Sequence, residues 1–397
     1  MTSQARGSGP ASLGPGTVPD GRVPDAERRA RAAWSRLAEP GDKDATRLIS
    51  TLGAVQALAC IAAADDPAAA RFAARLSELD VDRDLAMAAR FGAHVLCPGD
   101  PAWPAGLDVL QRSGWAPYCL WVRGVVDLGS ATRRAAAVVG ARSATAYGEM
   151  TAAEIATGLA QRRFTVVSGA AFGIDAAAHR GTLAVPGVTI AVLAGGVERP
   201  YPAAHARLIE HIAAEGAVVS EVPPGSAPTR RRFLQRNRLI ATMAQGTVVV
   251  EAGLRSGSLN TARTASDFGR VVLAVPGPVT SMMSAGCHEL IRSGRAELVT
   301  DAAEVAEAVG DYGCDLAAPK RAPARPTDDV DDDELRVLSA LPMGRGATVG
   351  RLAVAAGDSV AGVTAVLGRL ELAGLAERHG EGWRKGSALR GTRNEGR

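Results

Sequence analysis

The sequence predicts an α/β protein whose main part is a Rossmann-like, doubly wound and mainly parallel sheet. From about residue 135 onward, short Val-rich apolar runs alternate with helical stretches. The runs are AAAVVG (135–140), FTVVSG (164–169), VTIAVLAGG (188–196), AVVSE (217–221), TVVVEAG (247–253) and VVLAVPG (271–277). Continuous apolar runs are typical of parallel strands that helices cover on both faces. The sequence therefore predicts at least six such strands.

Different patterns flank this central part. Ala-rich amphipathic stretches from about residue 25 to residue 90 predict short helices. HVLCPGDPAWPAGLDVL and PYCLWVRG predict two more strands, and three helical stretches followed by AERHGEGWRKG predict a winged helix. We therefore expect a disordered leader over 1–25, an all-helical domain (SAM/helix-hairpin-helix-like) over 26–92, a Rossmann-like domain over 93–312, a linker over 313–329 and a winged-helix domain over 330–390.

Composition excludes several classes of protein. The 397 residues are 47% hydrophobic and 22% charged, with a net charge of +3. Apolar runs end well before the roughly 20 residues that a membrane helix needs, and the N-terminus has no apolar signal segment. The five cysteines are scattered, without a C-x-x-C pair, which disfavours a disulfide framework or a zinc site. We expect a cytoplasmic protein without membrane contact, metal or cofactor.

The stretch TRRRFLQRNRLIA (229–241) carries the strongest local charge signal, with five arginines and one phenylalanine. Arginine offers planar, bidentate donors to phosphate. On a helix beginning near residue 231, Phe233, Arg236, Asn237 and Ile240 share one face, since they are spaced i, i+3, i+4 and i+7. Arginines with an interleaved aromatic ring are typical of single-stranded nucleic-acid sites. The alternative is that Phe233 belongs to the core and that some of the five arginines are solvated. We expect solvation for one or two of Arg231, Arg232 and Arg238.

Four loops that follow the predicted strands are rich in small residues. They read GARS (140–143), SGAAFGID (168–175), AGG (194–196) and EAGLRSGS (251–258). The carboxyl ends of parallel strands meet at one edge of a doubly wound sheet, where ligands bind. Free backbone N–H groups and helix N-termini at that edge favour anions. The loops therefore predict a phosphate-binding crevice, although glycine also serves tight strand-to-helix turns.

Enzymatic interpretations depend on weaker signals. No G-x-G-x-x-G, P-loop or G-x-S-x-G motif occurs in the sequence. Asp175 and His179, four residues apart, could form an acid–base pair, and Glu221 and Glu251 at strand ends could act as general bases. These residues leave open a Rossmann-type hydrolase that cleaves the N-glycosidic bond of nucleotides.

A third alternative is a regulator that reads duplex DNA through the winged helix. The helix expected to enter the groove, SVAGVTAVLGRLELAGL, has no charge and no amide among its first ten residues. Base readout needs such side chains near the start of the helix. The sequence therefore predicts that the winged helix does not recognise a DNA sequence.

Eight motifs in order resemble the DNA processing protein A (DprA/Smf) family. They are VVGARSATAYG, VVSGAAFGIDAAAHRG, AVLAGGVERPYP, SEVPPG, FLQRNRLIA, VVVEAGLRSGSLNTA, GRVVLAVPG and SAGCHELIRSGRA, between about residues 95 and 310. The resemblance implies a non-catalytic protein. It implies a Rossmann-like domain that binds single-stranded DNA, usually in a homodimer, protects incoming DNA and loads the RecA recombinase onto it during natural transformation.

The resemblance also implies which residues contact DNA. Carried over motif by motif, they are Gly140, Arg142, Ser143, Ser168, Gly169, Arg230, Phe233, Arg236, Asn237, Arg238, Ser256, Gly257 and Ser258. Three positions depart from the family pattern. Leu234 replaces a proline, Ala194 begins a motif that usually reads G-T-G, and His288 stands where asparagine is usual.

Overall fold

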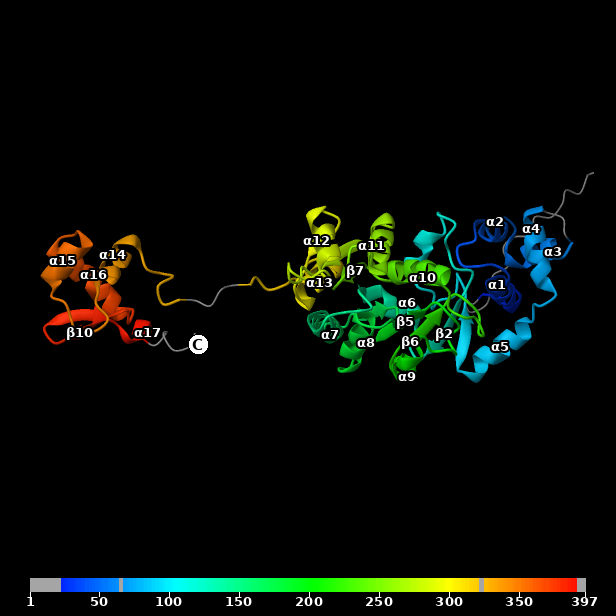
Figure 1. The fold of residues 1–397 in the computed structure, drawn as a ribbon, viewed down its shortest axis with the longest axis horizontal. Helices are drawn as coiled ribbons and strands as arrows, with labels where there is room; N and C mark the ends of the chain where they lie inside the picture. Colours follow the sequence, from blue (N-terminus) through cyan, green and yellow to red (C-terminus); the bar gives the residue numbers. More distant parts are fainter. Residues whose placement is uncertain (1–22, 64–66, 321–324, 391–397) are drawn as a thin grey trace, which may run out of the picture. The chain divides into compact units, whose positions relative to one another are not determined.

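The computed structural model describes residues 23–63, 67–320 and 325–390. The chain forms two compact units that divide after Ala317, and each is described by itself (Figure 1). The leader predicted over 1–25 lies outside the described residues up to residue 22, and Asp25 already begins the first helix. The division falls within the segment predicted as a linker.

Five helices open the larger unit: α1 (Asp25–Leu37), α2 (Lys43–Leu52), α3 (Ala54–Ala63), α4 (Pro67–Leu76) and α5 (Val81–Arg90). Aspartate side chains accept backbone N–H groups at the starts of α2 and α5, which is the usual way to begin a helix. The fully buried Trp34 packs edge-to-face on Phe72, with ring centroids 5.4 Å apart. These helices belong to the same compact unit as the sheet.

The sheet of the larger unit has nine strands in the order β1-β2-β6-β5-β4-β3-β7-β8-β9. Their bounds are β1 Ala93–Leu96, β2 Leu120–Gly124, β3 Ala135–Val139, β4 Thr165–Ser168, β5 Thr189–Leu193, β6 Ala217–Ser220, β7 Gly246–Val249, β8 Val271–Ala274 and β9 Glu297–Leu298. The six predicted Val-rich strands are β3 to β8, and all pair in parallel. The two strands predicted before them, β1 and β2, join the β6 edge antiparallel. The short β9 had no signal in the sequence.

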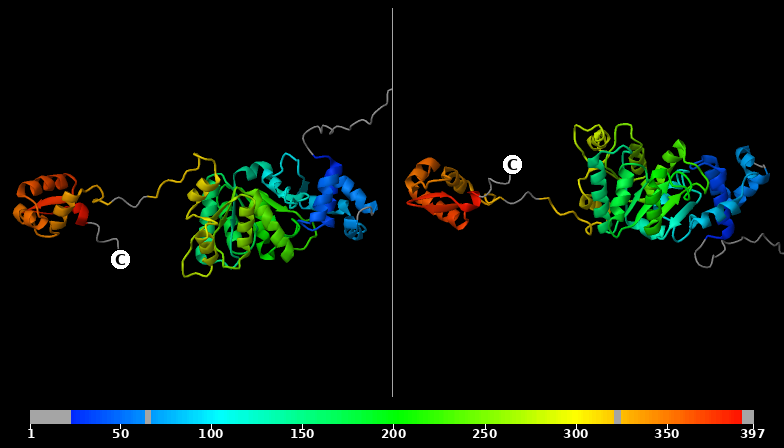
Figure 2. Two further views of the ribbon diagram at one scale, coloured as in Figure 1. Left: turned by 90° about the horizontal axis from the view of Figure 1, so that it is seen from above. Right: turned by 60° about the horizontal axis from the view of Figure 1, so that its bottom comes forward.

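Helices cover both faces of this sheet (Figures 1 and 2). Alternate residues of β3 point to opposite faces. Ala137 and Val139 pack beneath α10, whereas Ala136 and Val138 pack against α7 and α8. All five residues of β3 are buried, as expected for a strand between two helical layers.

Each of the remaining helices of this unit follows one strand of the sheet, from α6 after β2 to α13 after β9. They are α6 (Leu128–Ala131), α7 (Ala146–Gln161), α8 (Ile174–Leu183), α9 (Ala206–Glu215), α10 (Arg230–Met243), α11 (Gly257–Asp267), α12 (Ala285–Arg292) and α13 (Ala302–Val309), with 3-10 helices at Ala105–Leu110, Thr132–Arg134 and Ala203–His205. From β3 the chain proceeds outward to β6, then returns to place β7 on the other side of β3. The strand order therefore reverses between β3 and β7, and ligands of doubly wound sheets bind at such a point.

The smaller unit contains α14 (Asp332–Ala340), α15 (Val349–Ala356), α16 (Val360–Leu372), the antiparallel hairpin β10 (Ala376–His379) and β11 (Gly382–Lys385), and α17 (Ser387–Arg390). A capping box between Asp331 and Glu334 begins α14. Gly357, at φ 68°, ends α15 in the left-handed conformation that glycine adopts without strain. Trp383 of the hairpin packs in one core with the three longer helices.

Within the described residues, no single helix has both the length and the apolar character to cross a membrane. Two helix pairs meet that test only when each bent pair is taken together, namely α2 with α3 and α15 with α16.

Candidate nucleic-acid interface

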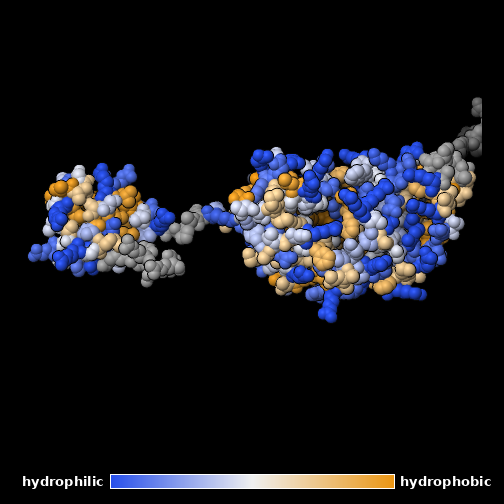
Figure 3. Space-filling view, in the orientation of Figure 1, coloured by the Kyte–Doolittle hydropathy of each residue, from blue (hydrophilic) through white to orange (hydrophobic). Residues whose placement is uncertain are grey.

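A cleft of about 860 Å³ opens at the carboxyl ends of the strands, where the strand order reverses. It is lined by the loops after β3, β4 and β7, by Tyr201 and by one side of α10 from Arg230 to Ile240. Ten of the thirteen predicted DNA contacts line it: Gly140, Arg142, Ser143, Arg230, Phe233, Arg236, Asn237, Ser256, Gly257 and Ser258. In the space-filling view, hydrophilic residues surround a hollow on the face of the larger unit (Figure 3).

Helix α10 brings its predicted face to the cleft. Thr229 caps the helix by accepting the backbone N–H of Arg232, so the helix begins at Arg230. Phe233, Asn237 and Ile240 all line the cleft, together with Arg236. The predicted spacing of these four residues on one face is confirmed.

The Phe233 ring lies between aromatic and cationic neighbours. The Tyr201 ring centroid is 5.6 Å away. The guanidinium carbons of Arg142 and Arg236 lie 4.8 Å and 5.8 Å from the centre of the Phe233 ring. The ring is half-buried and does not belong to the main hydrophobic cores. It therefore stands at the cleft surface, and the core alternative considered from the sequence does not hold.

Three exposed arginines stand around the cleft: Arg142 after β3, Arg230 at the start of α10, and Arg255 after β7. Among the described residues, none of the three has a carboxylate within ion-pair distance. The positive charge of this arginine rim is therefore available to an anion that enters from solvent.

The start of α11 adds uncharged donors. Ser256 caps the helix by accepting the N–H of Ser258, and the two hydroxyl oxygens are 2.7 Å apart. Both serines line the cleft beside Gly257. An N-terminal turn with hydroxyls and free N–H groups suits a phosphate oxygen.

Glycine at position 140 is required by close packing. A Cβ there would lie 2.5 Å from Ile174 Cγ1 and 2.9 Å from the carbonyl oxygen of Glu251. The side chain of Glu251 accepts the N–H of Thr145 at 2.9 Å and also its hydroxyl at 2.6 Å. Glu251 thereby holds the loop that carries Arg142 against the end of β7.

The other three predicted contacts do not line the cleft. The Ser168 hydroxyl donates to the carbonyl of Val138 inside the sheet. Gly169 lies against the Arg236 guanidinium, where a Cβ would meet Nη1 at 2.3 Å. Arg238 points to the opposite side of α10 and is buried. This placement corrects the prediction that Arg238 contacts DNA, because the Arg238 side chain is only 1% exposed.

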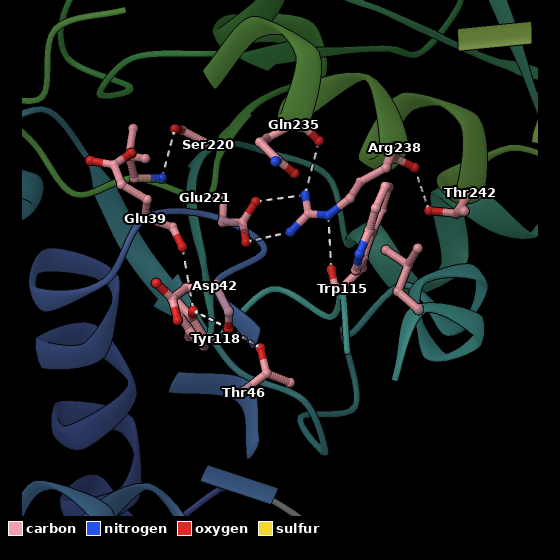
Figure 4. A network of polar contacts seen from close by, with 12 residues as sticks. Glu39, Asp42, Thr46, Trp115, Tyr118, Ser220, Glu221, Gln235, Arg238 and Thr242 are labelled. Carbon is pink, nitrogen blue, oxygen red and sulfur yellow. Dashed lines mark hydrogen bonds and ion pairs between the residues drawn. The ribbon is translucent and has the colours of Figure 1, made fainter. Parts of the chain in front are cut away.

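Arg238 and Arg232 instead bind carboxylates of other segments, and Figure 4 shows the contacts of Arg238. Arg238 donates to both oxygens of Glu221 at 2.7 Å and 2.6 Å, and its Nε donates to the carbonyl of Trp115. Arg232 donates to both oxygens of Glu39, at the end of α1, at 2.9 Å and 2.8 Å. The five arginines of the run therefore divide: two line the cleft, two are structural anchors and Arg231 is exposed.

The candidate catalytic groups are engaged elsewhere. The Asp175 carboxylate accepts backbone N–H groups, and His179 Nδ1 lies 2.7 Å from the Thr189 hydroxyl, so the two side chains do not pair. Burial lowers the pKa of His179 to about 3, with help from the neighbouring positive charges. Glu221 and Glu251 are held by Arg238 and Thr145. Neither glutamate lines the cleft.

Among the cleft residues that sequence reasoning left out of the predicted site, Arg255, Tyr201 and Asp175 carry a charge or an aromatic ring. Arg255 stood in a recognised loop but carried no motif of its own. Tyr201, in ERPYP, follows β5 and needs the folded chain to reach Phe233. The sequence pattern around Asp175 suggests only an acid–base group. Among the described residues, no group of three or more His, Cys, Asp or Glu is placed to hold a metal ion.

Comparisons with known proteins agree with this architecture. The model of the family described as DNA recombination-mediator protein A matches residues 94–310. The chain is 46% identical over 377 residues to a putative DNA processing protein DprA of Mycobacterium tuberculosis, covering 91% of this chain and 95% of that one. It is 41% identical over 190 residues to the DNA processing protein DprA of Streptococcus pneumoniae, covering 48% of this chain and 66% of that one.

The X-ray structure of DNA processing protein A from Streptococcus pneumoniae superposes with a TM-score of 0.59 at 29% identity, covering 72% of this chain and 97% of that one. The family match covers the whole parallel part of the sheet and the cleft, and the similarity to the mycobacterial protein extends along nearly the full length of both chains. The chain therefore belongs to the DNA recombination-mediator protein A family.

Proposed function

We propose that this protein binds single-stranded DNA in the cleft between β3, β7 and α10 and acts as a recombination mediator. One observation carries the proposal: three exposed arginines, which have no carboxylate within ion-pair distance among the described residues, line the same cleft as a half-buried aromatic ring. Arginines that follow a phosphate backbone and a ring that stacks a base are the two parts of a sequence-tolerant single-strand site.

The proposal also covers the partners, the location and the cellular role of the protein. We infer that the protein acts as a homodimer in the cytoplasm, protects incoming DNA during transformation and loads RecA onto it. Membership of the recombination-mediator family supports these inferences. The structural contacts of the candidate carboxylates support a non-enzymatic role. Glu221 and Glu251 in particular are held away from the cleft, by Arg238 and Thr145. A pull-down with the host RecA tests the partner.

We also propose roles for the flanking parts. The α14–α16 helices and the β10–β11 hairpin have the order of elements of a winged helix, and α1–α5 supply an all-helical SAM-like part. The outer residues at the start of α16 are small and neutral, which supports protein contact rather than base readout for this unit.

Fluorescence anisotropy with labelled oligo-dT tests the central proposal. The variant Arg142→Ala/Arg230→Ala/Arg255→Ala should bind more weakly. Its plot of log K against log salt should flatten by about 0.7 for each lost phosphate contact. The matched control removes three exposed arginines outside the cleft, namely Arg263, Arg292 and Arg295. Equal effects of the two triple variants would refute the site.

A second measurement separates binding from hydrolysis. Wild-type protein is incubated with nucleoside monophosphates, and free base is followed by chromatography. Release of base at a rate that depends on Asp175 would favour the N-glycosidic hydrolase, since Asp175 is the carboxylate among those considered that lines the cleft. We expect no release.

A further inference from the structure

Two oppositely charged residues that line the floor of the cleft, Asp175 and Arg236, contact the same backbone residue behind it, Gly169. The backbone N–H of Gly169 donates to Asp175 Oδ2 at 3.2 Å, and its carbonyl oxygen accepts Arg236 Nη1 at 2.9 Å. The N–H of Ala171 is directed at the same carboxylate oxygen at 3.4 Å. Ala170, between them, has φ 54°, which turns the two N–H groups toward one anion. The anion that occupies this backbone cradle is the protein's own Asp175.

Both side chains are withdrawn from solvent, at 6% exposure each, yet both residues line the cleft. Burial raises the pKa of Asp175, and the charge of Arg236 is the largest opposing influence. Burial likewise lowers the pKa of Arg236 to about 10, and the charge of Asp175 opposes that change. Each group is therefore the main electrostatic partner of the other.

Three of the five N–H groups of the Arg236 guanidinium donate to oxygens of the described protein. Nη1 donates to the carbonyls of Gly169 and Val192, and Nε donates to the Asn237 side chain at 3.3 Å. Within the described chain Arg236 has no carboxylate within ion-pair distance, so Asp175 acts on it through the shared residue Gly169 and through its charge. The arginine rim differs from Arg236 in exposure, since Arg142, Arg230 and Arg255 face solvent. The cleft thus has a floor where a buried carboxylate offsets a buried guanidinium, and a solvent-exposed positive rim.

We propose that Asp175 is a specificity-determining residue that neutralises Arg236, so that the cleft binds the phosphates of a strand at the arginine rim and an uncharged base or sugar at the floor. This inference rests on the proposed single-strand binding. A phosphate at the floor would lie beside a buried carboxylate, and like charges in a poorly solvated site repel strongly. A base meets no such repulsion and can stack on Phe233. Asp175 therefore orients the strand.

The test is the salt dependence of oligo-dT binding by the full chain. Asp175→Asn keeps an oxygen for the backbone N–H groups but leaves Arg236 uncompensated, so a phosphate can reach the floor. The slope of log K against log salt should steepen by about 0.7, an extra loss of affinity of about 2.6-fold between 50 and 200 mM salt. Inorganic phosphate should also compete better with oligo-dT than it does against wild type. A folded variant with an unchanged or flatter slope would overturn the proposal.

The matched control is Asp100→Asn. Asp100 is also buried, also accepts two backbone N–H groups, those of Cys97 and Val23, and also faces an arginine, Arg28, but it lies outside the cleft. It changes the net charge equally. We expect its slope to match that of wild type, and a steeper slope in both variants would show a general charge effect instead.

A second variant keeps the proposal testable if Asp175→Asn does not fold. Arg236→Gln leaves the carboxylate uncompensated, so affinity should fall while the slope stays constant, because no phosphate contact is lost. The double variant Asp175→Asn/Arg236→Gln should recover most of the affinity that Arg236→Gln loses. If the role of Asp175 were purely structural, the second substitution would not recover affinity. A slope flattened by about 0.7 in Arg236→Gln would show that Arg236 itself binds phosphate and would overturn the proposal.

A wild-type measurement needs no variant. An abasic oligomer of the same length should bind more weakly than oligo-dT with the same slope, because it keeps the phosphates and lacks the bases. Equal affinity would contradict a base at the floor. Failure of wild type to bind oligo-dT at all would instead refute the proposed function, so the two failures are distinguishable.

Discussion

Arg238 and Glu221 form a two-fold hydrogen-bonded ion pair inside the protein, with donor–acceptor distances of 2.7 Å and 2.6 Å. The two residues are 1% and 5% exposed. The pair joins α10 to the residue that follows β6, and the Trp115 carbonyl accepts from the same guanidinium (Figure 4). The arginine run thus fixes the helix from one side while it offers charge to the cleft from the other.

Removing one member of this pair should destabilise the protein. Arg238→Met leaves the Glu221 carboxylate buried without its partner, which typically costs about 3–5 kcal/mol in the free energy of unfolding. Urea unfolding followed by circular dichroism measures the change. The control, Arg292→Ala, breaks an exposed pair with Glu289 and should cost less than about 1 kcal/mol. Similar losses in the two variants would contradict the anchoring role.

Replacing both members separates stability from binding. Arg238→Met with Glu221→Met removes both buried charges, so part of the lost stability should return. Because Arg238 does not line the cleft, the salt slope of oligo-dT binding should match wild type in this double variant. A flatter salt slope would show instead that Arg238 contacts phosphate.

Phe233→Ala should weaken oligo-dT binding by roughly 1–3 kcal/mol, the usual contribution of one stacked base. The salt slope should hardly change, because stacking displaces no counterions. Phe172→Ala is the matched control, since Phe172 is another partly exposed ring, packed on His205, that does not line the cleft. Equal losses in both variants, or a collapse of the melting temperature in Phe233→Ala alone, would argue against stacking.

The contact between Arg232 and Glu39 should make stability depend on pH. The Arg232 hydrogen bonds lower the pKa of Glu39 in the folded state. A carboxylate with a lowered pKa stabilises the fold above its unfolded pKa of about 4.3, and this contribution is lost as the pH falls through the folded value. Wild type should therefore be more stable than Arg232→Ala at pH 7, and the difference in urea midpoint should shrink below about pH 4. A constant difference would contradict the linkage.

Removing the smaller unit should leave single-strand binding nearly intact. A chain that ends at Ala317 keeps the whole cleft, and the buried residues of α16 serve the core of the smaller unit. Oligo-dT affinity should stay within a few-fold of wild type, measured by anisotropy. A loss of about a hundredfold, or a footprint of the full chain at a defined duplex sequence, would show that this unit reads DNA.

The sequence by itself determined the features that depend on local patterns. The Val-rich runs predicted β3 to β8 because a strand buried on both faces must be apolar throughout. The spacing of Phe233 and Asn237 predicted the face of α10 that lines the cleft, since a helix repeats every 3.6 residues. Small residues after the strands predicted where the cleft opens. The eight family motifs added the family, which the comparisons confirm.

Only the tertiary structure decided how each charge is used. Arg232 and Arg238 look like Arg230 and Arg236 in the sequence, but their carboxylate partners come from distant segments, Glu39 being 193 residues before Arg232. The same holds for Asp175, which reaches Arg236 through the shared residue Gly169. A local pattern shows that a residue is charged and on which side of a helix it lies. Whether that charge is free, buried or neutralised depends on which strands and helices the fold brings next to it, and therefore on contacts that no local window contains.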